Sequence, residues 1–86
     1  MIEISEKKVI GPIIRLHPND NVVVARIDAS IGMQVPSENF SIRSQVPAGY
    51  KIAARKINKG EPILKYNVIV GFANTDIDAG SMVHSH

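Results

Sequence analysis

Apolar residues in this chain occur in short runs, and each run ends at a group of turn-forming residues. The run from Asn21 to Ile27 contains three consecutive valines, which favour a strand buried on both faces because β-branched side chains restrict χ1. Tyr50 to Lys56 nearly alternates between apolar and polar residues, as a half-buried strand does. Pro36 to Ser41 predicts a single helical turn capped by Ser37, because no apolar period extends it. Further short strands are predicted at residues 13–16, 33–35, 42–46, 62–66, 68–73 and 81–86.

Turn signals recur at intervals of about ten residues, which is typical of small all-β proteins. The densest lie at residues 17–21 and 58–62, where Pro, Gly, Asn and Asp supply the backbone angles of tight turns. The spacing I-x-x-G at residues 57–60 returns at residues 77–80, so the chain contains an internal repeat. These patterns predict an all-β fold of short strands with little helix, either a small barrel or a folded-over clip.

The length of the chain limits how large a core it can build. With 86 residues we expect one domain, spanning residues 1–86, with a thin core. Residues 1–8 are interpreted as a leader or edge segment, and residues 81–86 as a C-terminal extended segment. The sequence has no cysteine, so neither a disulfide nor a zinc–thiolate site can reinforce the core. Chains of this size often gain stability from a metal or a partner, and we expect a partner here.

The charge pattern argues against nucleic acid and membranes as partners. The formal net charge is +2, and the lysines and arginines are scattered rather than gathered in a stripe with aromatic residues. Residues 51–65 are locally basic, which a solvated strand face explains. No apolar run approaches the roughly 20 residues of a membrane span, and the first residues lack the pattern of a signal peptide. The sequence therefore predicts a cytoplasmic protein.

Three long motifs resemble those of the altronate/galactarate dehydratase family, and the similarity covers residues 13–86. The first is RLHP-x-DNV-x-VA at residues 15–25. The second combines VPAGYKIA at residues 46–53 with I-x-x-GEPI-x-KY at residues 57–66. The third is I-x-G-x-A-x-x-DI-x-x-G-x-x-VHSH at residues 69–86.

The sequence departs from the family pattern in three places. Tyr50 stands where the family commonly has His, and Ser81-Met82 replaces a Glu-His pair. These two departures remove groups that could bind a metal or transfer a proton, so they bear on the substrate. Asn67 stands where Gly is usual, and Asn is the non-glycine residue best able to adopt a positive φ.

The resemblance implies both a fold and an activity. In that family the region is a small SAF-type domain with a β-clip fold, placed ahead of a large catalytic domain or carried as a separate small subunit. The small subunit of sulfolactate sulfo-lyase is similar. The implied enzyme is a hydro-lyase that removes water from a sugar acid such as altronate or galactarate. The resemblance also implies a divalent metal ion, such as Fe or Mn, shared with the large subunit.

The histidines are the candidate metal ligands. His84 and His86 project to the same face if the segment is extended, so the two imidazoles can share one metal ion or one anionic substrate. A histidine pair of this kind also fits a frayed end or the remnant of a tag, and the resemblance favours the ligand role. His17 follows a predicted strand. It is either a third ligand that meets the other two or a turn histidine bonded to nearby backbone.

Lys51 and Lys65 are the candidate substrate-binding residues, because an ammonium group pairs with the carboxylate of a sugar acid. Lysines on a small sheet are more often simply solvated, and that alternative stays open. Asp20 and Asn21 are predicted to be turn residues rather than catalytic groups. No residue of this chain is assigned as the catalytic base, which we expect on the large partner.

The leading hypothesis is therefore a small subunit or N-terminal domain that lines part of a dehydratase active site. We expect it to be inactive without its large catalytic partner, and assembly into a homo-oligomer is also compatible with the sequence. One alternative is the small subunit of sulfolactate sulfo-lyase, which releases sulfite instead of water. Another is a non-catalytic β-clip module that binds a partner or a carbohydrate.

Overall fold

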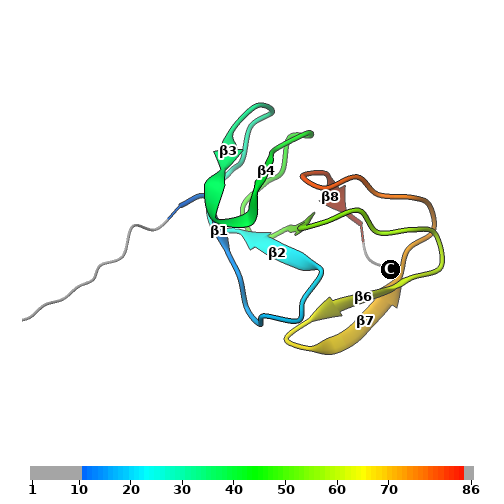
Figure 1. The fold of residues 1–86 in the computed structure, drawn as a ribbon. Helices are drawn as coiled ribbons and strands as arrows, with labels where there is room; N and C mark the ends of the chain where they lie inside the picture. Colours follow the sequence, from blue (N-terminus) through cyan, green and yellow to red (C-terminus); the bar gives the residue numbers. More distant parts are fainter. Residues whose placement is uncertain (1–10, 85–86) are drawn as a thin grey trace, which may run out of the picture.

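We describe residues 11–84 in a computed structural model, so the predicted leader at residues 1–8 and the candidate ligand His86 lie outside the described residues. The described part consists almost wholly of short strands and turns (Figure 1), which confirms the predicted small all-β fold. Its elements are β1 (Ile13–Ile14), β2 (Val22–Ala25), β3 (Gln34–Val35), the 3-10 helix η2 (Pro36–Glu38), β4 (Phe40–Ser41), β5 (Lys51–Ala53), β6 (Pro62–Lys65), β7 (Val68–Phe72) and β8 (Met82–Val83).

An antiparallel sheet with the strand order β1-β2-β5-β8 forms the centre of the domain. Val23 lies opposite Ile52, whereas Val24 lies opposite Lys51, which in turn lies opposite Val83. Directly opposed residues share a face of a sheet, and successive residues alternate between faces. Val23 and Ile52 therefore face one side, while Lys51 and its two neighbours face the other.

Each face of the central sheet is covered by a two-stranded hairpin, so the core has two parts. Figure 1 shows the β3–β4 and β6–β7 hairpins on opposite sides of the central strands. Both parts are aliphatic, and each fully buried Val or Ile contributes about 1.5–3 kcal/mol to folding. The first cluster contains Val23, Ala25, Ala29, Val35, Ile42, Val46 and Ile52. The second contains Val22, Ala53, Ile57, Ile63, Ala73 and Val83.

The internal repeat occurs at four places within residues 11–84, not only the two seen in the sequence. Ile57 and Ile77 exchange two backbone hydrogen bonds, and Ala29 and Val46 do the same. Three positions after each of them a glycine adopts a φ near +90° in a turn closed by a hydrogen bond between residues i and i+3. These glycines are Gly32, Gly49, Gly60 and Gly80. The copies that begin at Ala29 and Val46 were not recognised in the sequence because their first residue is not isoleucine.

Two local predictions are wrong. The 3-10 helix η2 has Val35 at its N-cap and no side-chain cap hydrogen bond, so Ser37 is not the cap. Pro36 occupies a first helical position, where its fixed φ starts the turn without a side-chain acceptor. The strand expected at residues 42–46 does not form, because the backbone N–H groups of Ile42, Arg43 and Val46 bond three different segments, at Met33, Gly80 and Ala29, instead of one neighbouring strand.

The turn between β6 and β7 agrees with the sequence. Tyr66 and Asn67 have φ values of 56° and 59°, which is the backbone of a two-residue type I′ hairpin turn. Asn67 thus adopts the positive φ for which the family uses Gly. Among the described residues, no helix has the length and apolar character to cross a bilayer.

Candidate functional site

The two candidate substrate-binding lysines are close together in the structure. Lys51 projects from the sheet face that β6 covers, and Lys65 is the last residue of β6. The pKa of Lys51 is lowered from its usual value, mainly because the ammonium is partly buried and also because Lys65 repels its charge. Two neighbouring ammonium groups attract a ligand that carries carboxylates. Their role as substrate ligands stays a prediction.

Asp20 and Asn21 fix the β6–β7 hairpin, and with it Lys65, against the central sheet. Both side chains are buried, at 5% and 3% exposure. The carboxylate of Asp20 accepts hydrogen bonds from the backbone N–H groups of Tyr66 and Asn67, at 2.8 and 2.7 Å. The side chain of Asn21 bonds the edge of β6, donating to the carbonyl of Pro62 and accepting from the N–H of Leu64. Neither residue is a free catalytic group, in agreement with the turn role predicted for them.

A bidentate ion pair ties the loop between β1 and β2 to the 3-10 helix η2. The guanidinium of Arg15 donates two hydrogen bonds of 2.8 Å to the carboxylate of Glu38, and these raise the pKa of Arg15. The same guanidinium donates to the backbone carbonyls of His17 and Asp20, each at 2.9 Å. Sequence analysis missed this arrangement because 23 residues separate the two charged partners and no local pattern connects them.

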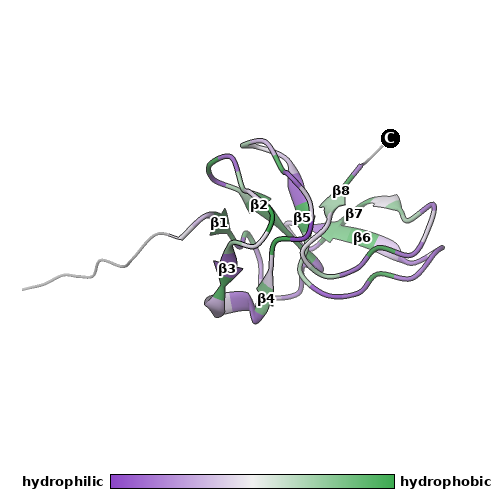
Figure 2. Ribbon diagram, turned by 90° about the horizontal axis from the view of Figure 1, so that it is seen from above, coloured by the Kyte–Doolittle hydropathy of each residue, from purple (hydrophilic) through white to green (hydrophobic). Residues whose placement is uncertain are grey.

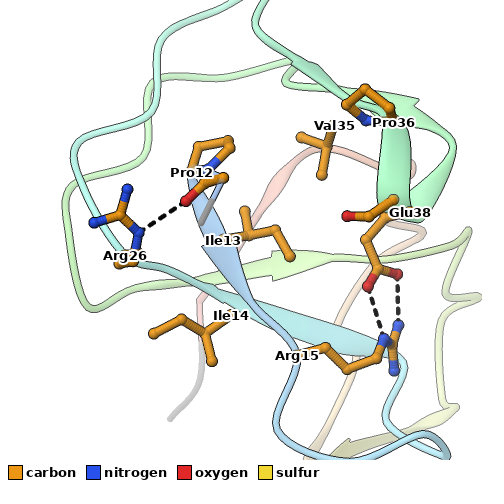
Figure 3. A pocket seen from close by; sticks show the side chains of 10 residues that line it. Pro12, Ile13, Ile14, Arg15, Arg26, Val35, Pro36 and Glu38 are labelled. Carbon is orange, nitrogen blue, oxygen red and sulfur yellow. Dashed lines mark hydrogen bonds and ion pairs between the residues drawn. The ribbon is translucent and has the colours of Figure 1, made fainter. Parts of the chain in front are cut away.

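A pocket of about 690 Å³ lies between β1 and the segment that contains η2 (Figure 3). Pro12, Ile13, Ile14, Val35 and Pro36 give it apolar walls. The pair of Arg15 and Glu38 lies at its rim, and Arg26 donates a hydrogen bond to the carbonyl of Gly11. Within residues 11–84, no histidine and neither candidate lysine lines this pocket, so it is distinct from the predicted substrate site.

His17 behaves as the turn histidine that one of the two interpretations predicted. Its Nδ1 accepts a hydrogen bond of 3.0 Å from the backbone N–H of Asn19. His17 follows β1 and exposed His84 follows β8, and these strands form the two opposite edges of the central sheet. Three strand spacings of about 4.8 Å separate such edges. The sheet therefore does not bring His17 and His84 together.

The described residues do not build a metal site by themselves. Residues 11–84 contain no cluster of three or more His, Asp or Glu side chains that could hold an ion. His86 lies outside the described residues, so the pairing of His84 with His86 stays a prediction. Two histidines do not fill the coordination shell of a divalent ion, so any ion bound by this pair needs further ligands.

Comparison with known proteins agrees with the motifs. The chain is 40% identical to altronate dehydratase of Escherichia coli (strain K12) over 75 residues, which are 85% of this chain and 15% of that protein. It is 33% identical to altronate dehydratase of Bacillus subtilis (strain 168), with the same coverage. It is 30% identical to the alpha subunit of (2R)-sulfolactate sulfo-lyase of Paracoccus pantotrophus over 56 residues, which are 60% of this chain and 84% of that subunit. The chain thus spans only a small part of the dehydratases it matches.

A family profile described as the altronate/galactarate dehydratase SAF domain matches residues 11–86. That match begins at the first described residue, just before β1, and includes both hairpins and both lysines. The chain therefore belongs to the altronate/galactarate dehydratase SAF domain family.

Proposed function

We propose that this domain is part of a sugar-acid dehydratase and lines one wall of its active site. The rest of that enzyme, here called the catalytic body, either continues on the same polypeptide or is a separate large subunit. The observation that carries the proposal is the proximity of Lys51 and Lys65, two cations from different strands on the face covered by the β6–β7 hairpin. A sugar acid such as altronate or galactarate offers the carboxylate that such a site attracts.

The role of the domain follows from the chemistry of dehydration. A base removes the proton on the carbon next to the carboxylate, and the hydroxyl on the following carbon leaves as water. The resulting enol rearranges to a 2-keto-3-deoxy acid, so the atoms of substrate and products balance. Lys51 and Lys65 would hold the carboxylate and stabilise the negative charge that develops when the proton leaves. We assign the base to the catalytic body.

Reconstitution tests this proposal. The domain and the catalytic body are purified separately where they are separate chains, or the domain is deleted where they are fused. We expect altronate or galactarate to be converted to a 2-keto-3-deoxy acid only when both parts are present. Full dehydratase activity of the catalytic body without this domain would contradict the proposal and would favour a non-catalytic binding module.

A second candidate is the small subunit of a sulfolactate sulfo-lyase. It is favoured by the relative from Paracoccus pantotrophus, 84% of whose length this chain matches, so a stand-alone subunit of this size has a precedent. Sulfolactate also carries two anionic groups that suit a pair of lysines. Release of sulfite from sulfolactate by the reconstituted enzyme, without dehydration of any sugar acid, would select this alternative.

The predicted metal ion forms a separate part of the proposal. A divalent ion such as Fe or Mn would bind mainly to the catalytic body, with His84 and His86 as additional ligands and His17 as a less suitable one. We expect the complete enzyme to contain about one such ion per active site and the His84→Ala/His86→Ala variant to contain less. Elemental analysis of both proteins measures this. Equal metal content would remove these two histidines from the ligand set.

A further inference from the structure

The outer face of the β6–β7 hairpin is apolar and exposed. Ile63 faces the core and is 1% exposed. Leu64 lies opposite Ile69, and Pro62 lies opposite Phe72, so these four side chains share the opposite face. We call them the docking face. Ile69 and Phe72 are 53% and 62% exposed. A hairpin that is apolar on both faces is typical of a sheet covered on both sides.

The outer backbone edge of β7 is open as well. Within residues 11–84, β6 is the only strand that pairs with β7. The other edge of β6 is covered by the side chain of Asn21. Natural edge strands use charged residues or proline to prevent pairing with other chains, and Val68–Phe72 contains neither. The strand therefore has the sequence of one that is covered in the assembled protein.

We propose that the docking face and the edge of β7 bind the catalytic body of the enzyme, and this inference rests on the proposed function. The exposed apolar side chains of the hairpin present roughly 400–500 Å². A stable dimer of separate chains commonly buries about 800 Å² per partner, so this surface alone is too small to bind a second copy of this domain stably. Interfaces between domains of one protein commonly bury about 600–1,500 Å² in total, or about 300–750 Å² on each side, and the surface of the hairpin lies within that range.

The size of the dehydratase relatives supports the same occupant. This chain matches 15% of the E. coli altronate dehydratase, so in such an enzyme a body several times larger adjoins the domain. Figure 2 shows that the β6–β7 hairpin lies at one side of the domain, away from the β3–β4 hairpin and accessible to such a body. A fused or tightly associated body is held at high effective concentration, so a modest apolar contact is enough to fix its position.

Docking at this face has a consequence for the candidate site. Lys65 shares the inner face of the hairpin with Ile63, because residues i and i+2 of a strand point to the same side. A contact on the outer face thus holds the hairpin against the central sheet and keeps Lys65 beside Lys51. The lysines themselves lie on the inner side of the hairpin, outside the proposed contact.

Substitutions on the docking face test the proposal. In the Ile69→Thr/Phe72→Thr variant the strand preference is kept, because threonine is β-branched, while the two exposed large side chains of the docking face are lost. Ile31→Thr is the matched control, since Ile31 is 68% exposed and lies in a turn outside the hairpin. We expect the double variant to bind the catalytic body at least tenfold more weakly and the control to bind within twofold of the wild type. All three domains should melt at the same temperature. Equal binding by the double variant and the wild type would overturn the proposal.

A photo-cross-linking amino acid at position 72 of the complete enzyme provides a second measurement, which also applies where the two parts are fused. The expected product joins this position to a peptide of the catalytic body. A product that joins two copies of this domain, or no product at all, would reject the assignment. If the wild-type enzyme dehydrates its substrate and no such product forms, the docking face is wrong and the proposed function stands. If the product forms and no sugar acid is dehydrated, the docking face stands and the proposed function fails.

Discussion

Replacing Asp20 by alanine should detach the β6–β7 hairpin and dismantle the candidate site. The buried carboxylate accepts the N–H groups of Tyr66 and Asn67, and alanine would leave both without this partner. A hydrogen bond to a charged group contributes about 1.5–3 kcal/mol, while release of a buried charge offsets part of the loss. We therefore expect the free energy of unfolding to fall by about 2–4 kcal/mol. Small domains have roughly 0.05–0.15 kcal/mol of stability per residue, so this loss is a large fraction of the total.

Urea denaturation followed by far-UV circular dichroism measures the global effect of Asp20→Ala, and hydrogen exchange measures the local one. The amides of Tyr66 and Asn67 should exchange faster in the variant, because their acceptor is gone. Asp20→Asn is the matched control: its amide oxygen can accept one of the two hydrogen bonds, so it should lose about half as much stability. If Asp20→Ala lowers the free energy of unfolding by less than about 0.5 kcal/mol, the size of an ordinary surface substitution, and leaves amide exchange unchanged, Asp20 does not hold the hairpin in place.

Three further predictions concern single side chains. In an NMR titration the pKa of Lys51 should lie below those of the other lysines, and it should rise in the Lys65→Met variant. The unfolded chain binds this proton more tightly than the folded domain, so the free energy of unfolding should increase with pH between the folded pKa of Lys51 and the usual 10.5. The pKa of Glu61 is lowered by a hydrogen bond from the backbone N–H of Asn58 and by Arg55, so the stability that the Glu61 carboxylate contributes should be lost as the pH falls through that lowered pKa. The Glu61→Gln variant should therefore show a flatter acid denaturation profile, and a profile equal to that of the wild type would contradict this prediction. Gly80→Ala should lose at least about 2 kcal/mol in urea denaturation, because its Cβ would overlap the carbonyl oxygen of Ser41 at a positive φ, whereas Gly71→Ala, where a Cβ meets open space, should lose much less.

The strands were predictable because their signals are local. The valine run marks β2 as a buried strand, and both of its first two residues are fully buried. The type I′ turn is encoded within the turn itself, since Asn67 is one of the few residues that tolerate its backbone angles. The all-β class followed from such short-range patterns, and the family resemblance followed from motifs that span nearly the whole chain.

The arrangement around the candidate site was not predictable from spacing. Asp20 bonds a turn that lies 46 and 47 residues further along the chain, and Arg15 pairs with Glu38 across 23 residues. Such contacts depend on how the hairpins fold over the central sheet, which no local pattern encodes. Spacing also does not show that His17 and His84 follow β1 and β8, the strands at opposite edges of the central sheet. The role of these two histidines and of His86 as metal ligands stays a prediction.

The most direct test of the account is the steady-state kinetics of the complete enzyme with the two lysines replaced. Lys51→Met and Lys65→Met should each raise KM for the sugar acid about tenfold or more, and the double variant should lose less than the product of the two because both hold one carboxylate. Lys59→Met, at an exposed turn position, should leave the kinetics unchanged. Unaltered kcat and KM in the double variant would contradict the claim that this domain forms a wall of the active site.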